Sequence, residues 1–310
     1  MEALMAALLT AALIGYNRYR FGQTEKQYPP RGEFVAADGI KLHYLSKGDG
    51  KPVVFLHGGV LTGSDFEEVL DLAAAGGYRG IAFDRPGYGY SERPRNGRVT
   101  LRTQAALLHQ ALAAMGAERP ILVGHSWSGA LALAYALEYP DDVSGIVTLG
   151  GGMYAEGYPA EKGDPISSLV TMPVIGSIVM NTLLAVFGPP LADFMLKATF
   201  RPEPVPEAYR RRARAFWLRP NQFRANREDV LAFVPAVKAM AGRYRAIRTP
   251  LVIAVGEDDP FETKEHSYRL HDNVPGSRLI ALPCVAHMIP QLHPEAVMEA
   301  IEALPANAKS

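Results

Sequence analysis

The chain has 310 residues, 48% of them hydrophobic, and its acidic and basic residues balance to a formal net charge of zero at pH 7. This length and hydrophobicity suit one large α/β domain, or two smaller ones, with a sizeable core. The balanced charge argues against general affinity for nucleic acid. Cys284 is the only cysteine, so no internal disulfide can form, and we expect it to be a small buried residue. No cluster of residues resembles a zinc site, and we expect no cofactor.

An apolar run over residues 3–16 opens the chain, and a polar, proline-containing linker is predicted at residues 22–31. A membrane-spanning helix needs roughly 20 apolar residues, so the run is short for a span. The acidic Glu2 and the lack of a convincing cleavage site are atypical of a signal peptide.

We therefore interpret residues 1–32 as a membrane anchor and linker. Because the basic residues Arg18, Arg20 and Lys26 follow the run, the orientation of a span would place the rest of the protein in the cytoplasm. The alternative is a cytoplasmic protein in which this helix packs on the domain or frays.

The folded domain is predicted to begin near Glu33, with a hairpin whose turn is Asp38-Gly39. Alternating strands and helices follow, with strands predicted within residues 52–59 and 80–91 and at residues 121–123 and 143–149. Helices are predicted at residues 64–75 and 100–115 and in the Ala/Leu-rich stretch that leads to Pro140. Later in the chain, strands are predicted within residues 249–260 and at residues 278–282. This alternation indicates a mostly parallel sheet covered on both faces, with ligands bound outside the carboxyl ends of the strands.

The alternation of strands and helices stops over residues 152–248. This segment holds apolar helical stretches at residues 175–187 and 191–200 and an arginine-rich helix at residues 206–219, with no sign of a parallel strand. We interpret it as a helical lid inserted into the core, which comprises residues 33–151 and 249–310. The arginine-rich helix is interpreted as a solvated face, with contact to anionic lipid or a substrate carboxylate as the alternative.

The stretch GHSWSG, which contains Ser126, has a strand before it and an Ala/Leu-rich helix directly after it. A strand that turns at once into a helix holds its turning residue in a strained conformation, with the side chain exposed at the edge of the sheet. This is the nucleophile-elbow pattern, and Ser126 is the candidate nucleophile. The pattern has glycine two residues after the serine, where this chain has Ser128, a residue almost as small.

A serine hydroxyl needs a base, and the base needs a group that orients it. His287 follows the last predicted strand and is the candidate base, whereas His57 and His125 are interpreted as structural. The candidate acid follows the strand before it, where Asp259 is preferred and Asp258 is the alternative. The residues after Asp259 also fit a capping box with Pro260 at the first helical position, which would fix the carboxylate.

A developing oxyanion needs preorganised donors. In an elbow the N–H of the residue after the nucleophile, here Trp127, points into the site. The second donor is expected from Gly59 or Val60, in the glycine-containing loop after residues 52–56.

The motifs HGG at His57, DRPGYGYS at Asp84, GHSWSG at Gly124, GEDDP at Gly256 and AHMIPQLHPE at Ala286 together resemble the α/β-hydrolase superfamily. The resemblance runs from about residue 33 to residue 304 and implies an eight-stranded sheet. It supports Asp259 over Asp258 as the acid and His287 as the base. The apolar N-terminus also resembles that of membrane-tethered bacterial members, although it is shorter.

Within this superfamily a serine nucleophile is unlike the aspartate of haloalkane dehalogenases and epoxide hydrolases. The sequence therefore predicts a carboxylesterase or lipase that forms an acyl-enzyme on small-molecule esters with a hydrophobic acyl group. The alternatives are a C–C bond hydrolase, a lactonase or a cofactor-free haloperoxidase-like enzyme and, in another class, a non-catalytic ligand-binding protein on the same fold.

Overall fold

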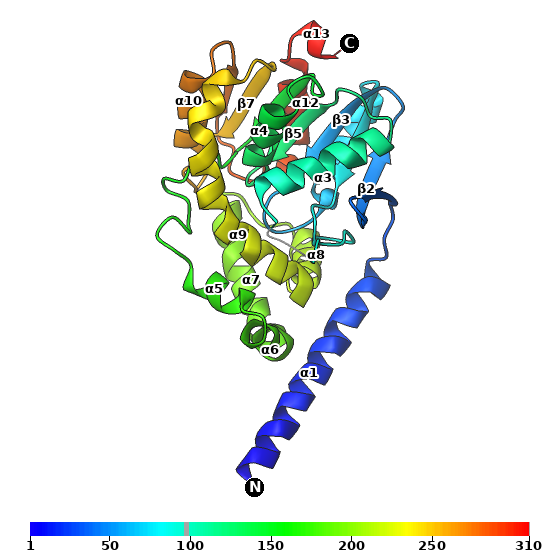
Figure 1. The fold of residues 1–310 in the computed structure, drawn as a ribbon, viewed down its shortest axis with the longest axis vertical. Helices are drawn as coiled ribbons and strands as arrows, with labels where there is room; N and C mark the ends of the chain where they lie inside the picture. The colour runs from blue at the N-terminus through cyan, green and yellow to red at the C-terminus, as the bar shows by residue number, and fades with distance from the viewer. Residues whose placement is uncertain (96–98, 310) are drawn as a thin grey trace.

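A computed structural model describes residues 1–95 and 99–309, which form an eight-stranded sheet with helices on both faces (Figure 1). The strands are β1 (Glu33–Ala37), β2 (Ile40–Lys47), β3 (Lys51–Leu56), β4 (Tyr78–Phe83), β5 (Ile121–His125), β6 (Gly145–Leu149), β7 (Leu251–Gly256) and β8 (Arg278–Leu282). They lie in the order β1-β2-β4-β3-β5-β6-β7-β8, and only the pairs made by β2 are antiparallel. The predicted α/β fold with its mostly parallel sheet is confirmed.

Successive strand residues alternate between two hydrophobic cores, one on each face of the sheet. In β3, Val53 and Phe55 face one core, and Val54 and Leu56 face the other. The first core is covered by α2 (Glu67–Ala75) and α12 (Pro294–Glu302), and the second by α3 (Leu101–Ala114), α4 (Ser128–Glu138) and α10 (Thr263–Asn273). Burial on both faces explains why the central strands β5, β6 and β7 are largely apolar runs in the sequence.

Five helices stand between β6 and β7, where the sequence predicts a helical segment. They are α5 (Pro165–Thr171), α6 (Ile175–Thr182), α7 (Leu184–Phe200), α8 (Glu207–Phe216) and α9 (Pro220–Met240), and we call them the insertion. The sequence predicts separate helices at residues 175–187 and 191–200, and the interruption between them is wrong. The helix α7 continues through Pro189 and Pro190, and the interruption lies at Leu183, between α6 and α7. Leu184 and Leu196 anchor α7 in hydrophobic clusters, and this packing offsets the hydrogen bonds lost at the prolines.

The N-terminal helix α1 (Glu2–Gln27) is longer than predicted, and the expected linker is helical as far as Gln27. Its second half is held by the insertion, because Phe21 packs on an apolar cluster there and the Thr24 hydroxyl donates to the carbonyl of Ala215. Residues 1–12 are exposed and extend away from the body of the protein (Figure 1). Among the described residues no single helix combines the length and apolarity needed to cross a membrane; α5 and α6 reach them only as a pair bent by 99°.

The short elements η1 (Gly63–Phe66), η2 (Ala241–Ala246), α11 (Ile289–Leu292) and α13 (Ala306–Lys309) complete the described structure. The expectation that Cys284 is buried is wrong. Cys284 lies in the turn after β8 with a φ of 60°, and its side chain is exposed.

Gly124 allows β5 to turn directly into α4, because a Cβ there would lie 2.2 Å from the carbonyl oxygen of Ser128. We expect Gly124→Ala to lower the free energy of unfolding by about 3 kcal/mol, since backbone must move to relieve the overlap. Urea unfolding followed by circular dichroism measures this change. Gly242→Ala is the matched control, because its Cβ would meet nothing within 4 Å. Equal stabilities of the two variants would contradict the steric argument.

Candidate active site

Ser126 lies at the turn between β5 and α4 with a φ of 55°, in the left-handed region that L-residues rarely adopt. Its N–H donates to the carbonyl of Leu149 at 3.0 Å, and its carbonyl accepts from the N–H groups of Gly129 and Gly152 at 2.9 and 3.0 Å. Every other residue from 121 to 130 is buried, whereas Ser126 is partly exposed. The turn therefore presents this one side chain at the carboxyl edge of the sheet.

The structure brings Ser126, His287 and Asp259 together from the ends of β5, β8 and β7. The Nε2 atom of His287 is 2.9 Å from the Ser126 hydroxyl oxygen, and its Nδ1 atom is 2.7 Å from Oδ2 of Asp259. His287 is buried, and the side chain of Asp259 is fully buried. Asp258 is exposed and contributes a backbone N–H to the carbonyl of Val285, so Asp259 is the aspartate that contacts the histidine.

Two further donors hold the carboxylate of Asp259. The N–H of Phe261 and the hydroxyl of Thr263 donate to it at 2.9 and 2.5 Å. The predicted capping box is wrong, because α10 begins at Thr263 and not at Pro260, and the Asp259 side chain instead closes the turn before the helix. Burial raises the pKa of Asp259, but the charge of His287 and these hydrogen bonds outweigh it and leave the pKa below its ordinary value.

The residue after β6, Gly150, leaves room for this pair. A Cβ on Gly150 would lie 3.1 Å from Oδ2 of Asp259 and 3.3 Å from Nδ1 of His287, and its φ is 48°. The sequence offers no carboxylate at this position, and the structure gives a steric reason for glycine there.

The loop after β3 lies against Ser126. A Cβ on Gly58 would be 3.1 Å from the Cβ of Ser126 and 3.6 Å from its hydroxyl oxygen, so only glycine fits this approach. The backbone hydrogen bonds of the described residues leave the N–H groups of Gly59, Val60 and Trp127 without an acceptor. These are the three positions at which the sequence predicts oxyanion donors.

Two polar side chains of α9 hold this loop, a third binds the Arg85 that also donates to it, and sequence reasoning missed all three. Asn226 donates to the carbonyl of Gly59 at 2.6 Å, and Gln222 donates to that of Val60 at 3.1 Å. Gln222, Asn226 and Asp229 are all buried and recur at helical spacing, four and three residues apart. This spacing of polar residues on one face of a helix was the available signal.

Arg85 connects α9 to the elbow and to the loop after β3. Its guanidinium is 1% exposed and donates to Oδ2 of Asp229 at 2.6 Å and to the carbonyls of Gly58 and His57 at 3.0 and 3.2 Å. It also lies 4.1 Å from the centroid of the Trp127 ring, close enough for a cation–π contact. The arginine of the DRPGYGYS motif is therefore a structural support of the site.

His57 and His125 are structural, as the sequence predicts. His57 donates from Nδ1 to the carbonyl of Gly58 at 2.8 Å, and its Nε2 accepts the N–H of Arg85 at 3.0 Å. Burial lowers the pKa of His125 to about 3, and its Nε2 donates to the carbonyl of His287 at 2.9 Å.

Ser128, where the elbow pattern has glycine, is not a neutral replacement. Its hydroxyl is buried and donates to the carbonyl of His57 at 2.6 Å, which ties the elbow to the loop after β3. The sequence did not indicate this contact.

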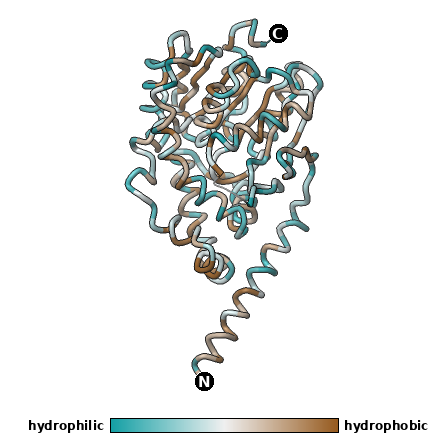
Figure 2. Tube along the Cα trace, viewed as in Figure 1, coloured by the Kyte–Doolittle hydropathy of each residue, from teal (hydrophilic) through white to brown (hydrophobic). Residues whose placement is uncertain are grey.

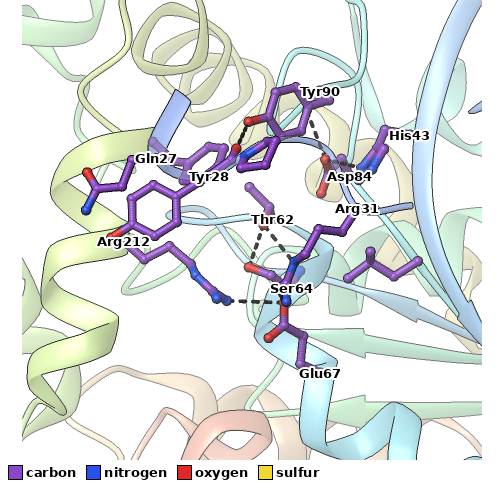
Figure 3. A pocket seen from close by; sticks show the side chains of 13 residues that line it. Gln27, Tyr28, Arg31, His43, Thr62, Ser64, Glu67, Asp84, Tyr90 and Arg212 are labelled. Carbon is purple, nitrogen blue, oxygen red and sulfur yellow. Dashed lines mark hydrogen bonds and ion pairs between the residues drawn. The ribbon is translucent and has the colours of Figure 1, made fainter. Parts of the chain in front are cut away.

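A cavity of about 230 Å³ lies elsewhere, between the end of α1, β2 and α8 (Figure 3). Tyr28, His43 and Tyr90 line it, and Glu67 pairs there with Arg212. Ser126, His287 and Asp259 do not line this cavity. Among residues 1–95 and 99–309, no three His, Cys, Asp or Glu side chains are grouped as a metal site would require.

A family model described as "alpha/beta hydrolase fold" matches residues 51–294. The chain is 29% identical over 276 residues to a 2-hydroxy-6-oxononadienedioate/2-hydroxy-6-oxononatrienedioate hydrolase of Burkholderia vietnamiensis, covering 84% of this chain and 90% of that protein. Among solved structures it resembles a thermophilic esterase from Thermogutta terrifontis, with a TM-score of 0.71, 20% identity and coverage of 90% of this chain and 100% of the other. It also resembles Est816, described as an N-acyl homoserine lactone degrading enzyme, with a TM-score of 0.66, 24% identity and coverage of 87% and 99%.

The buried carboxylate of Asp229 balances two guanidinium groups, because it accepts from Arg85 and also from Arg93 at 2.9 Å. We expect Asp229→Ala to lower the free energy of unfolding by about 3–5 kcal/mol, since buried cations lose their partner. The neighbouring Glu228→Ala is the control. Glu228 is 35% exposed and pairs with Arg93 and Arg224, so its loss should cost at most about 1 kcal/mol. Denaturant unfolding of both variants tests this, and similar losses would contradict it.

Proposed function

The chain belongs to the α/β hydrolase fold family and is a hydrolase, and we propose that it is a serine carboxylesterase or lipase that forms an acyl-enzyme on Ser126. The observation that carries this proposal is the continuous hydrogen-bonded path from the Ser126 hydroxyl through His287 to the buried Asp259. Such a path supplies the base that a serine needs and the group that orients the base.

In the proposed reaction, His287 Nε2 takes the proton of the Ser126 hydroxyl as its oxygen attacks the ester carbonyl. The N–H of Trp127, together with that of Gly59 or Val60, holds the resulting oxyanion. The C–O bond then breaks, and the leaving alcohol takes the proton from His287. Water repeats the sequence on the acyl-enzyme, giving the acid and free Ser126. Asp259 stays ionised and stabilises the imidazolium in both halves.

Hydrophobic acyl groups are favoured by what surrounds the loop after β3. Val60 packs against two apolar clusters of the insertion, and Met288, next to His287, belongs to one of them. Arg85, which follows β4 and donates to two backbone carbonyls of this loop, has its charge paired with Asp229. An uncharged, apolar substrate fits these surroundings better than a dicarboxylate.

Hydrolysis of a C–C bond next to a carbonyl is the second candidate, because the Burkholderia relative is a 2-hydroxy-6-oxononadienedioate/2-hydroxy-6-oxononatrienedioate hydrolase. A panel of p-nitrophenyl esters and vinylogous 2-hydroxy-6-oxo acids separates the two. Our proposal requires kcat/KM to be higher for the esters and to rise from acetate to octanoate.

We further propose that α1 attaches the protein to a membrane, because its first twelve residues are exposed and largely apolar. The basic residues Arg18, Arg20 and Lys26 follow this stretch, which favours the cytoplasmic side for the hydrolase domain. Finding the full-length protein wholly in the soluble fraction of lysed cells would contradict this attachment.

We expect Ser126→Ala to lower turnover of p-nitrophenyl butyrate about 10⁴- to 10⁶-fold, since the hydroxyl is the nucleophile. A fluorophosphonate probe should label the wild type and fail to label this variant. Ser128→Ala is the matched control, because it lies on the same elbow but its hydroxyl donates to the backbone, and it should keep the label. A folded wild type that the probe does not label would instead support a non-catalytic binding protein.

A further inference from the structure

Two stretches of the chain carry no charged side chain and yet form exposed helices. Residues 3–17, in α1, and residues 165–192, which span α5, α6 and the first half of α7, contain no Asp, Glu, Lys or Arg. Charge-free stretches also occur in the core strands, but those are buried. An exposed helix in water normally carries charge on its outer face.

The exposed large hydrophobic side chains of the described residues gather on these helices. Within residues 20–95, 99–165 and 195–309, only Phe34 and Tyr268 are large hydrophobic residues with exposed side chains. The members in α1 and its ends are Met1, Leu4, Met5, Leu8, Leu9, Tyr16 and Tyr19, and those in the insertion are Ile166, Leu169, Met172, Val174, Ile175, Ile178, Leu183, Val186, Phe187, Leu191 and Phe194. A concentration of exposed apolar side chains of this extent marks a site of interaction.

The two sets lie on neighbouring helices at one end of the molecule. The second half of α1 contacts α6, α7 and α8, with Asn17 and Thr24 buried in the contact. In Figure 2 the traces of α6 and of the first turns of α1 have largely hydrophobic colours, and both lie at the end of the molecule opposite the C-terminus. We call the exposed apolar side chains of α1 and α5–α7 together the apolar end.

We propose that the apolar end is seated in a lipid bilayer, so that the insertion itself, and not α1 alone, contacts the membrane. The border of the apolar end has the composition of a membrane interface. In α1 the apolar run ends at the exposed aromatic residues Tyr16 and Tyr19, which alternate with the exposed basic residues Arg18 and Arg20. Aromatic rings and basic side chains are enriched where a protein passes from acyl chains to anionic headgroups.

The bent pair α5–α6 fits a segment that enters one leaflet and returns. Taken together the two helices are as apolar as a membrane span, yet they are bent by 99°. An interfacial helix buries its apolar face by roughly 5–10 Å at the boundary of headgroups and acyl chains. Phe187 and Phe194, 65% and 68% exposed, extend the same surface along α7.

The test is flotation of the full-length protein with vesicles of phosphatidylcholine and phosphatidylglycerol. Phe187→Asp/Phe194→Asp changes the insertion, and Leu4→Asp/Leu8→Asp changes α1. We expect each pair to lower the partition coefficient at least about tenfold, because charged side chains must leave water or pull the helix out of the interface. Phe34→Asp/Tyr268→Asp, which changes the exposed hydrophobic residues elsewhere, is the control and should bind as the wild type does.

Thermal unfolding followed by circular dichroism shows whether each variant is folded, and this readout does not depend on the proposed catalytic activity. Wild-type binding by Phe187→Asp/Phe194→Asp would overturn the inference and leave α1 as the sole anchor. A wild type that does not float would overturn it as well. A third result would also overturn the inference: a wild type that is dimeric without lipid and becomes monomeric with Phe187→Asp/Phe194→Asp. The apolar end would then be an interface between two copies of the chain.

Discussion

The buried ion pair between Arg85 and Asp229 is the interaction on which the site most depends. Two charges withdrawn from water are tolerated only where hydrogen bonds satisfy the remaining donors and acceptors. Here Arg85 also donates to the backbone of the loop after β3, and Asp229 also accepts from Tyr88 and Gln104. Since Asp229 is on α9, the position of the loop next to Ser126 is set by the insertion as well as by the sheet. The insertion cannot move away from the core at this point without breaking the pair.

The parts of the site that could be predicted from the sequence are those that follow strands. Ser126 and Asp259 each come after an apolar run that is buried on both faces, and His287 follows the partly buried edge strand β8. Parallel strands bring their carboxyl ends to one edge of the sheet. Asn226 and Gln222 escaped prediction because they lie on a helix of the insertion, where no strand fixes their place. Their helical spacing is visible in the sequence, but their partners, the carbonyls of Gly59 and Val60, are more than 160 residues away.

At two places in the chain, tertiary contacts override the structure that the local sequence pattern predicts. Gly22 marks a linker by composition, yet the packing of Phe21 and the hydrogen bond of Thr24 continue the helix past it. The residues after Asp259 match a helix start, yet the carboxylate is shared between His287, Phe261 and Thr263, and the helix begins later. In both cases the local sequence pattern is present, but contacts with residues from other parts of the fold decide where the helix ends or begins.

The insertion has two faces of opposite character, and this division gives its helices separate roles. Toward the core, α9 buries amide and carboxylate groups whose hydrogen bonds are made, so their burial costs little. Away from the core, α5–α7 expose apolar side chains, which is costly in water unless another apolar phase covers them. The apolar cluster that contains Val170, Leu184 and Phe223 joins the two faces and reaches Val60, in the loop that lies against Ser126. If the apolar end is seated in a bilayer, as we propose, this cluster connects the lipid to the loop next to Ser126 without passing through water.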